Sequence, residues 1–196
     1  GGSSGIGREY ARELAAKGWN LIIVSNREED NVRVAEELSR QYGIKAEPLY
    51  ADLTEADAAE KIYDHVQRLG VEVEVLINNA GMLLFSQLVN TPASQLELII
   101  ALHCTTPTKL CQLFARDMAA RGRGHILIMS SITAWTPYPT ISHYAATKAY
   151  LHSFAQSLWY EMRGRGVSVT AVYPSAVKNW KQCPVASQRM TLPQNI

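Results

Sequence analysis

The chain has 196 residues, of which 47% are hydrophobic and 19% charged, and its formal net charge is +1. These values are typical of one globular domain with a buried core. The balanced charge and the lack of a long basic run argue against a nucleic-acid partner. Every apolar run is strand-sized, far below the roughly 20 residues of a membrane-spanning helix, so we expect no membrane span.

The cysteines and histidines argue against a disulfide framework and against a metal site. Cys104 and Cys111 are separated by about 10 Å of helical rise on a predicted helix, too far for a disulfide. Together with Cys183 they are expected to be free thiols, which are typical of a reducing compartment, so we predict a cytoplasmic protein. The sequence has no Cys-x-x-Cys and its five histidines are scattered, so no metal is expected.

Predicted helices and strands alternate along the chain. Short apolar strands are predicted at residues 21–24, 46–50, 73–77, 125–129 and 167–173. Helices are predicted from the first glycines to Gly18, at about 31–42, after Thr54 as N-cap, after Thr91-Pro92, and from Tyr144 to Met162. The strands are β-branched and do not alternate between apolar and polar residues, which indicates a parallel sheet covered by helices on both faces. The predicted fold class is α/β, a doubly wound parallel sheet with three α/β/α layers.

Small and polar residues follow the predicted strands at their carboxyl ends, where ligands bind in parallel sheets. They are Asp52, the run from Asn78 to Gly81, Ser130-Ser131 and Pro174. The glycines at positions 1, 5 and 7 lead into a helix. Glycines let a pyrophosphate approach the backbone, and the helix N-terminus supplies N–H groups and a positive dipole. A flexible turn without a ligand is the alternative interpretation of this loop.

Tyr144 and Lys148 are four residues apart, so both side chains lie on one face of the predicted helix. A free tyrosine ionises near pH ~10, and an ammonium one turn away favours the phenolate and lowers that value. The pair is therefore a candidate proton donor and acceptor. The alternative is a pair of solvated side chains that share a helix face by chance.

Four motifs in order resemble the short-chain dehydrogenase/reductase family. They are Gly-x-x-x-Gly-x-Gly opening a helix, Asn-Asn-Ala-Gly after a strand, Ser-Ser after the next strand, and Tyr-x-x-x-Lys. The resemblance covers about residues 1–177 and implies a Rossmann-like fold and an oxidoreductase. The sequence is loosely similar to the branch of 17β-hydroxysteroid dehydrogenases and 3-ketoacyl reductases. The glycine spacing and Asn-Asn-Ala-Gly argue against a sugar-nucleotide epimerase, which also uses Tyr-x-x-x-Lys.

The resemblance implies a role for each matching residue. Tyr144 would exchange a proton with the substrate oxygen, Lys148 would lower the pKa of Tyr144 and bind the nicotinamide ribose, and Ser131 would hydrogen-bond the substrate oxygen. Ser131 is otherwise a strand-end turn serine, and Asp52 and Asn78 could each stabilise only a turn. The implied cofactor contacts are Gly1, Ser3, Gly5, Ile6 and Gly7 at the pyrophosphate and ribose, Asp52 and Leu53 at the adenine, Asn78, Ala80 and Gly81 at the ribose, then Tyr144, Lys148, Pro174 and Val177.

The residues that follow the predicted strand at 21–24 decide whether the cofactor is NAD or NADP. NAD sites of this type have an acidic residue there, which binds the ribose hydroxyls. This chain has Ser25, Asn26 and Arg27 instead. Arg27 could pair with a 2′-phosphate, so we predict NADP(H) in preference to NAD(H). The alternative is a solvated arginine that the neighbouring Glu28 and Glu29 neutralise.

Two apolar loops indicate the substrate class. One is Met82-Leu83-Leu84-Phe85, and the other carries Trp135, Pro137, Tyr138 and Pro139 between Ser131 and Tyr144. Both would flank the site, which favours a lipophilic small-molecule ketone or alcohol. Core or subunit packing is the alternative, and the family resemblance implies a homodimer or homotetramer.

The sequence departs from the family pattern at two places with chemical consequences. The family has an asparagine that holds a proton-relay water where this chain has His103, which is either a substitute relay or a buried structural histidine. After the last predicted strand, Ser175 and Asn179 replace the usual glycine and threonine. These departures support a second hypothesis, a non-catalytic nucleotide-binding or interaction protein of the same fold.

The ends of the sequence also differ from the family pattern. No strand precedes Gly1, and periodicity is lost after Val177. We therefore predict a truncated nucleotide-binding domain over residues 1–177, without the first and last strands, and an irregular tail over residues 178–196. A disordered terminus, an alternative ending or a fragment would each explain this pattern and would each put autonomous activity in question.

Overall fold

The computed structural model describes residues 1–137 and 139–175. Helices and strands alternate through nearly all of this part of the chain. The helices are α1 (Gly5–Ala16), α2 (Glu28–Tyr42), α3 (Ala58–Leu69), α4 (Ala93–Ile100), α5 (Thr106–Arg121) and α6 (Ser142–Met162). The strands are β1 (Leu21–Ser25), β2 (Ala46–Tyr50), β3 (Val75–Asn78), β4 (Gly124–Met129) and β5 (Val167–Val172). Two short 3₁₀ turns cover Leu88–Asn90 and Ile132–Ala134.

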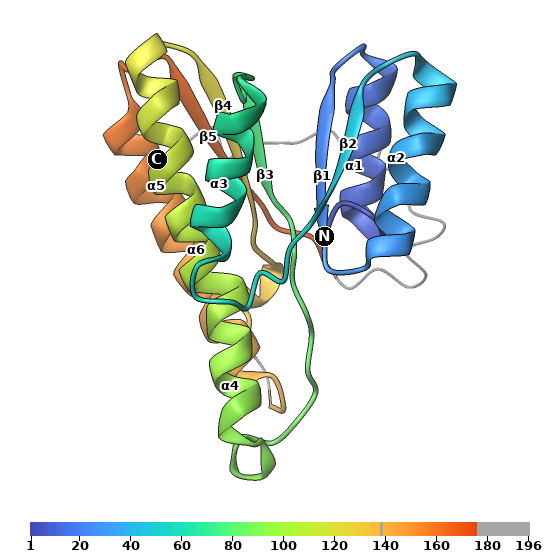
Figure 1. The fold of residues 1–196 in the computed structure, drawn as a ribbon. Helices are drawn as coiled ribbons and strands as arrows, with labels where there is room; N and C mark the ends of the chain where they lie inside the picture. Colours follow the sequence, from blue (N-terminus) through green and yellow to red (C-terminus); the bar gives the residue numbers. More distant parts are fainter. Residues whose placement is uncertain (138, 176–196) are drawn as a thin grey trace.

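The strands are parallel and form two groups. β1 pairs with β2, and β4 lies between β3 and β5. In Figure 1, α3 and α5 lie in front of the strands and α1 lies behind them, which gives the three predicted layers. The carboxyl ends of all strands point to the side of the molecule from which α4 projects. The predicted α/β, Rossmann-like architecture is confirmed.

Two predicted helix starts are wrong, and local hydrogen bonds explain one of them. α2 begins at Glu28 rather than near Asn31, and its first turn carries three acidic residues, which favour a helix N-terminus. α3 has Asp57 rather than Thr54 at the N-cap position. The hydroxyl and backbone N–H of Thr54 instead donate to Oδ1 of Asp52, at 2.8 and 3.0 Å. Thr54 therefore closes the turn after β2, and the helix starts one turn later.

The long helical region after Pro92 contains a π-helical turn. α4 and α5 are joined without a break by Ala101–Thr105, whose wider turn carries His103. Single π turns inside α-helices are frequent at functional sites. His103 and Ile99 are both 0% exposed, so this part of the helix faces the interior. The π turn changes which side chains face inward, and the sequence pattern did not predict it.

Two hydrophobic clusters stabilise the fold, and side chains of β1 and β2, among them Ile22, Val24 and Leu49, also pack against the larger one. The larger cluster joins α3, α5 and α6 to β4 and β5, with Met118, Ile126 and Ile128 fully buried. The smaller cluster joins α1 and α2 to β1. Cys104 and Cys111 are buried free thiols, and Cys183 lies outside the described residues. In the described ranges no helix is long and apolar enough to cross a membrane.

Candidate functional site

Four segments meet at the carboxyl ends of the strands: the glycine loop before α1, the loop after β3, the end of β4, and the first turns of α6. Gly1 lies against the loop after β3, because a Cβ at Gly1 would be 2.9 Å from the Cα of Ala80. The Nδ2 of Asn79 donates to the carbonyl of Gly1 over 3.2 Å. The two loops that the resemblance assigns to the dinucleotide are thus in direct contact.

The glycine loop is close-packed, which explains its composition. A Cβ at Gly7 would lie 2.1 Å from the carbonyl oxygen of Gly1 and 2.6 Å from Nδ2 of Asn79, so no larger residue fits. Gly5, the first residue of α1, has a φ of 56° in the left-handed region that favours glycine. Ile6 follows in the first turn of α1. The loop presents a helix N-terminus with little side-chain cover, which fits an anionic pyrophosphate.

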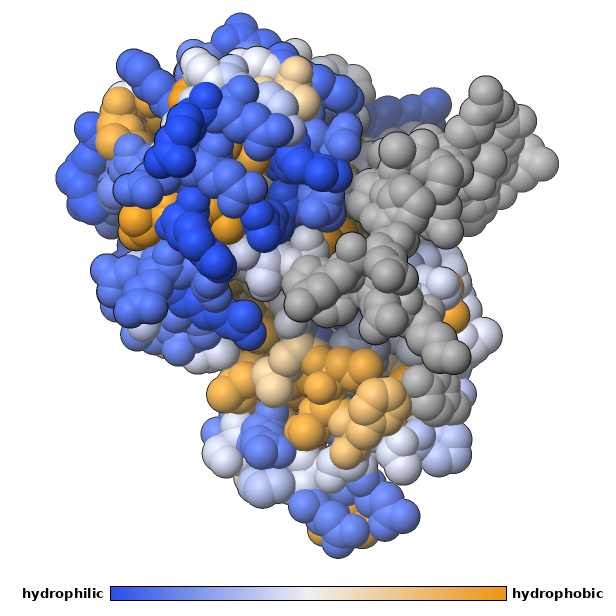
Figure 2. Space-filling view, turned by 90° about the vertical axis from the view of Figure 1, so that its right-hand side faces the viewer, coloured by the Kyte–Doolittle hydropathy of each residue, from blue (hydrophilic) through white to orange (hydrophobic). Residues whose placement is uncertain are grey.

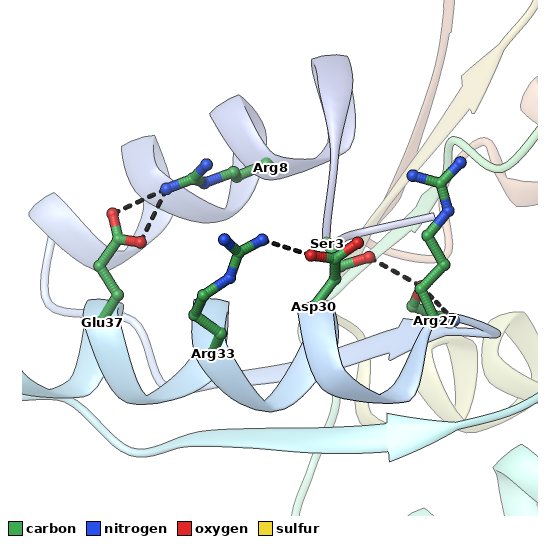
Figure 3. A network of polar contacts seen from close by, with 7 residues as sticks. Ser3, Arg8, Arg27, Asp30, Arg33 and Glu37 are labelled. Carbon is green, nitrogen blue, oxygen red and sulfur yellow. Dashed lines mark hydrogen bonds and ion pairs between the residues drawn. The ribbon is translucent and has the colours of Figure 1, made fainter.

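Ser25 fixes the end of β1 to the glycine loop. Its hydroxyl is 2.8 Å from that of Ser3 and accepts a hydrogen bond from the backbone N–H of Arg27 at 3.1 Å. In Figure 3 the guanidinium of Arg27 extends away from the ion pairs that Arg8 forms with Glu37 and Arg33 with Asp30. Within the part of the chain that the structure describes, the guanidinium of Arg27 has no ion-pair partner. Its neutralisation by Glu28 and Glu29 is therefore absent from this structure.

Several of the predicted cofactor residues form hydrogen bonds within the protein, through a side chain or a backbone carbonyl. Asp52 holds Thr54, and the carbonyl of Leu53 accepts from the hydroxyl of Thr106 at 2.7 Å. Nδ2 of Asn78 donates to Sγ of Cys111 over 3.2 Å. Asn26 is exposed beside Arg27. These contacts show a turn-stabilising role for Asp52 and a contact of Asn78 with α5, and leave the cofactor roles of both residues as predictions.

Lys148 is a buried cation at the end of β4. Its side chain is on α6, only 4% of the residue is exposed, and Nζ donates to the carbonyl of Met129 at 2.8 Å. The hydroxyl of Ser130 donates to the carbonyl of Lys148, also at 2.8 Å, which fixes α6 to the end of β4. Burial lowers the pKa of Lys148 from 10.5 to about 8. The ammonium is therefore held in place and poorly solvated.

Tyr144 lies over this ammonium. Nζ of Lys148 is 5.6 Å from the centre of the Tyr144 ring, and the ring is half-buried. Gly81 approaches the same place, since a Cβ there would lie 3.7 Å from Nζ of Lys148. The structure thus brings together the tyrosine, the lysine and the loop after β3. The predicted one-face arrangement of Tyr144 and Lys148 exists, with Lys148 buried rather than solvated.

Ser131 follows β4 and precedes the short 3₁₀ turn over Ile132–Ala134. It is 6% exposed, and its Oγ accepts a hydrogen bond of 3.3 Å from the backbone N–H of Thr133. This is the strand-end turn role that the sequence left open. A hydroxyl that accepts in a turn still has its own proton to donate. The backbone carbonyl of Pro174 accepts from the N–H of Ile132 at 3.3 Å, whereas Val177 and Asn179 lie outside the described residues.

His103 joins three segments around Tyr144. Its Nε2 accepts a hydrogen bond of 3.0 Å from the N–H of Met82, so that nitrogen carries no proton. The neutral ring therefore has its proton on Nδ1, which lies 2.8 Å from the hydroxyl of Thr147. That hydroxyl donates in turn to the carbonyl of Tyr144. The His103 and Tyr144 ring centres are 5.7 Å apart.

The surroundings of His103 keep it neutral. Burial is the main reason that its pKa falls from 6.5 to about 3, and the positive charge of Lys148 adds to the effect. A ring that is neutral at every pH near 7 and bonded through both nitrogens cannot carry protons by titrating. Of the two interpretations of His103, the contacts favour the buried structural histidine.

We expect the His103→Asn variant to keep the pH profile of kcat. Because His103 is already neutral in the folded chain, no inflection between pH 5 and 8 should disappear. The magnitude of kcat should fall by roughly 10-fold, since the variant loses one or both of the hydrogen bonds that His103 makes to Met82 and Thr147. The measurement is kcat against pH, with His125→Asn on the exposed side of β4 as the control. Loss of an acidic inflection in His103→Asn alone would show that His103 titrates.

Thr147 and Asn79 are site residues that the sequence analysis did not assign. Thr147 connects His103 to the backbone of Tyr144, and Asn79 connects the two dinucleotide loops. The available signal for Thr147 was its place three residues after Tyr144, on the same helix face. Asn79 was visible only as part of Asn-Asn-Ala-Gly, in which the sequence does not say which asparagine faces the glycine loop.

The two apolar loops are exposed beside the site. Leu83 and Phe85 are 50% and 62% exposed, and Trp135 is 53% exposed. Figure 2 shows an apolar surface on the lower part of the molecule, where the loop after β3 and α4 lie. Trp135 packs on Tyr173 with ring centres 4.2 Å apart and contacts His152 edge-on. Tyr138, which the sequence placed in the same loop, is outside the described residues.

Comparisons with known proteins agree with this geometry. The family model described as short chain dehydrogenase matches residues 1–187. Over 182 residues the chain is 34% identical to 17-beta-hydroxysteroid dehydrogenase type 3 of Mus musculus, covering 90% of this chain and 58% of the relative. It is 36% identical over 177 residues to a very-long-chain 3-oxoacyl-CoA reductase of Pyricularia oryzae, covering 88% and 53%.

A solved structure shows the same likeness in three dimensions. A short-chain dehydrogenase from Sphingobium yanoikuyae in complex with NADPH superimposes with a TM-score of 0.86 at 33% identity, over 90% of this chain and 69% of that one. The chain spans little more than half the length of the two curated relatives. The order of the motifs, the parallel α/β fold and the family match over most of its length agree, and the chain belongs to the short-chain dehydrogenase family.

Proposed function

We propose that this chain is the dinucleotide-binding and proton-transfer part of an NADP(H)-dependent oxidoreductase, which interconverts a carbonyl and a secondary alcohol on a lipophilic substrate. The observation that carries the proposal is the buried Lys148 ammonium, 5.6 Å from the ring centre of Tyr144 at the carboxyl ends of parallel strands. Burying a cation without a partner of opposite charge costs free energy. Such ionisable groups cluster at functional sites. The hydrogen bond of Lys148 to the carbonyl of Met129 does not neutralise the ammonium.

The residues of the site fit a dinucleotide. The glycine loop has room only for backbone at Gly1 and Gly7 and offers the N-terminus of α1 to phosphate oxygens. Gly81 keeps side-chain atoms out of the space beside Lys148 and His103. When bound, a nicotinamide dinucleotide supplies or accepts the hydride.

The protein's own residues move and hold the proton. In the direction of reduction, the phenol of Tyr144 donates its proton to the substrate oxygen, and the Lys148 ammonium stabilises the phenolate that remains. The hydroxyl of Ser131 donates a hydrogen bond to the same oxygen as negative charge develops on it. Ser130 and Thr147 act on position only, because each fixes the backbone of α6. Oxidation uses the same groups in reverse.

Three observations support the choice of NADP(H) and of a lipophilic substrate. The guanidinium of Arg27 has no ion-pair partner among the described residues, and it lies beside the loop that contacts the dinucleotide. The apolar side chains of Leu83, Phe85 and Trp135 are about half exposed or more. The two curated relatives are named for a hydroxysteroid and for a very-long-chain 3-oxoacyl-CoA, both lipophilic.

The test is the oxidation of NADPH and NADH by the purified chain and by its Arg27→Ala variant, with a steroid ketone, a 3-oxoacyl thioester and an aryl ketone as substrates. We expect turnover with NADPH. In the variant KM for NADPH should rise by roughly 10-fold or more, the worth of a charge-assisted hydrogen bond, with KM for NADH unchanged. An equal change for both dinucleotides would contradict the role of Arg27. Dinucleotide binding without turnover on any substrate would favour the non-catalytic hypothesis.

A further inference from the structure

Three aromatic side chains from three separate segments pack together at the carboxyl ends of β4 and β5. Trp135 follows the 3₁₀ turn after β4, His152 lies on α6, and Tyr173 directly follows β5. The ring centres are 4.2 Å apart for Trp135 and Tyr173, 5.0 Å for Trp135 and His152, and 5.6 Å for His152 and Tyr173. We call these three side chains the aromatic cluster, and none of them has a role in the proton transfer described above.

The aromatic cluster is a neighbour of the proposed substrate-binding hydroxyl. The N–H of Ile132 donates to the carbonyl of Pro174 at 3.3 Å, which continues the parallel pairing of β4 with β5 past the ends of both strands. Ser131 directly precedes Ile132, and Tyr173 directly precedes Pro174. Ser131 and the aromatic cluster therefore lie on adjacent paired segments, and the third segment is α6, which also carries Tyr144.

The hydrogen bonds within the aromatic cluster run in one direction. An indole N–H can only donate, so Nε2 of His152, which is 3.4 Å from Nε1 of Trp135, accepts and carries no proton. The neutral ring then has its proton on Nδ1, which donates to the phenol oxygen of Tyr173 at 2.7 Å. Burial raises the pKa of Tyr173, so its oxygen is a neutral acceptor near pH 7. The orientation of the indole thus depends on both nitrogens of one imidazole.

The indole of Trp135 is held in place but is not covered. Tyr173 packs against it at an interplanar angle of 33°, and His152 meets it edge-on at 73°. The backbone N–H of Trp135 also donates to the carbonyl of Ile132 at 3.1 Å. Even so, 53% of Trp135 is exposed. A ring that is packed on one side and half exposed is a stacking surface for a second flat ring.

We propose that Trp135 determines substrate specificity by stacking on the ring of a planar aromatic ketone, and that His152 and Tyr173 are positioning residues that hold the indole. This inference rests on the proposed oxidoreductase function, in which Ser131 and Tyr144 bind the reacting carbonyl. A flat rigid ring contacts a fixed indole without loss of its own freedom, whereas a flexible acyl chain must be ordered to lie against the same surface. The aromatic cluster therefore favours aryl ketones over acyl chains among lipophilic substrates.

Two amide variants separate the two hydrogen bonds of His152. The terminal group of glutamine occupies the place of Nε2, so His152→Gln keeps an acceptor for Trp135 and loses the donor to Tyr173. The terminal group of asparagine occupies the place of Nδ1, so His152→Asn keeps only the donor to Tyr173. A role that is merely structural would be lost in both variants, whereas positioning of the indole through Nε2 would be lost in His152→Asn alone.

The kinetic test is KM and kcat with tetralone, an aryl ketone, and with decalone, the saturated ketone of the same carbon skeleton. In His152→Asn, KM for tetralone should rise by roughly 5-fold, the scale of one aromatic contact. We expect kcat for tetralone and KM for decalone to stay at the values of the parent chain, because decalone has no flat ring to stack. In His152→Gln, KM for tetralone should equal that of the parent chain.

The second measurement does not depend on turnover. It is fluorine NMR of the chain labelled with fluorotryptophan, in which the resonance of Trp135 is the one of four tryptophan signals that Trp135→Phe removes. In His152→Asn this resonance should move toward that of a free, solvated indole, and in His152→Gln it should stay in place. Titration of the parent chain on the same resonance should give a dissociation constant roughly 5-fold lower for tetralone than for decalone.

Three results would overturn the inference. An unmoved Trp135 resonance in His152→Asn would show that His152 does not position the indole. The same movement in both His152 variants would show that any loss of the imidazole loosens the aromatic cluster. Equal dissociation constants for tetralone and decalone would show that Trp135 does not select flat rings. Absence of turnover on both ketones, with the expected NMR results, would support the role of the aromatic cluster and contradict the proposed oxidoreductase function alone.

Discussion

Replacing Tyr144 with phenylalanine is expected to lower kcat for carbonyl reduction by about a thousandfold, the typical loss for a general acid, while the dissociation constant for NADPH changes by no more than a few-fold. The variant loses one oxygen and keeps the ring that lies over Lys148 and beside His103. The contacts that fix this part of α6 come from Thr147 and from the Lys148 backbone, and neither uses the phenol oxygen. The lost function is therefore proton donation and not the shape of the site.

The measurements are steady-state kcat and a direct NADPH titration. Tyr160→Phe is the matched control, because Tyr160 is on the same helix and is 55% exposed. It should behave as the parent chain does in both measurements. Retained turnover in Tyr144→Phe would remove Tyr144 from the proton path, and loss of NADPH binding would show that the phenol is mainly a cofactor contact.

The sequence was sufficient to predict the parallel sheet because its strands carry the information locally. Residues 21–24 were predicted as a strand and form most of β1 (Leu21–Ser25). Continuous apolar runs are needed where both faces are covered, so strand positions depend little on distant residues. Helix starts were less accurate, since Thr54 could equally cap a helix or close a turn with Asp52. The structure shows the turn.

The sequence placed Tyr144 and Lys148 near each other but did not show the electrostatics of the candidate site. Spacing placed Tyr144 and Lys148 on one helix face, yet it could not show that Lys148 points into the protein. That burial depends on the end of β4, which lies 19 residues earlier and supplies the Met129 carbonyl. The protonation of His103 likewise depends on Met82 and Thr147, which are 21 and 44 residues away. Contacts of this kind appear only once the chain is folded.

Burial of Lys148 predicts that removing its charge stabilises the chain in a pH-dependent way. Folding lowers the pKa of Lys148 from 10.5 to about 8. Between these values the unfolded chain keeps the lysine proton and the folded chain releases it, so the unfolded state binds more protons. The contribution of Lys148 to the free energy of unfolding must then rise with pH across this window. It is constant below about pH 8, where both states are charged, and constant again above pH 10.5, where both are neutral.

We therefore expect the free energy of unfolding of the parent chain, minus that of Lys148→Met, to increase by about 3 kcal/mol from pH 8 to 10.5, since each pKa unit corresponds to about 1.4 kcal/mol. The measurement is urea unfolding of both chains at several pH values. Lys61→Met is the control, because bonds from Glu55 and Asp57 raise the pKa of the exposed Lys61 to about 12, so Lys61 stays charged throughout the window. A difference that does not change with pH would mean that water reaches the Lys148 ammonium, and the buried cation would no longer support the proposed oxidoreductase.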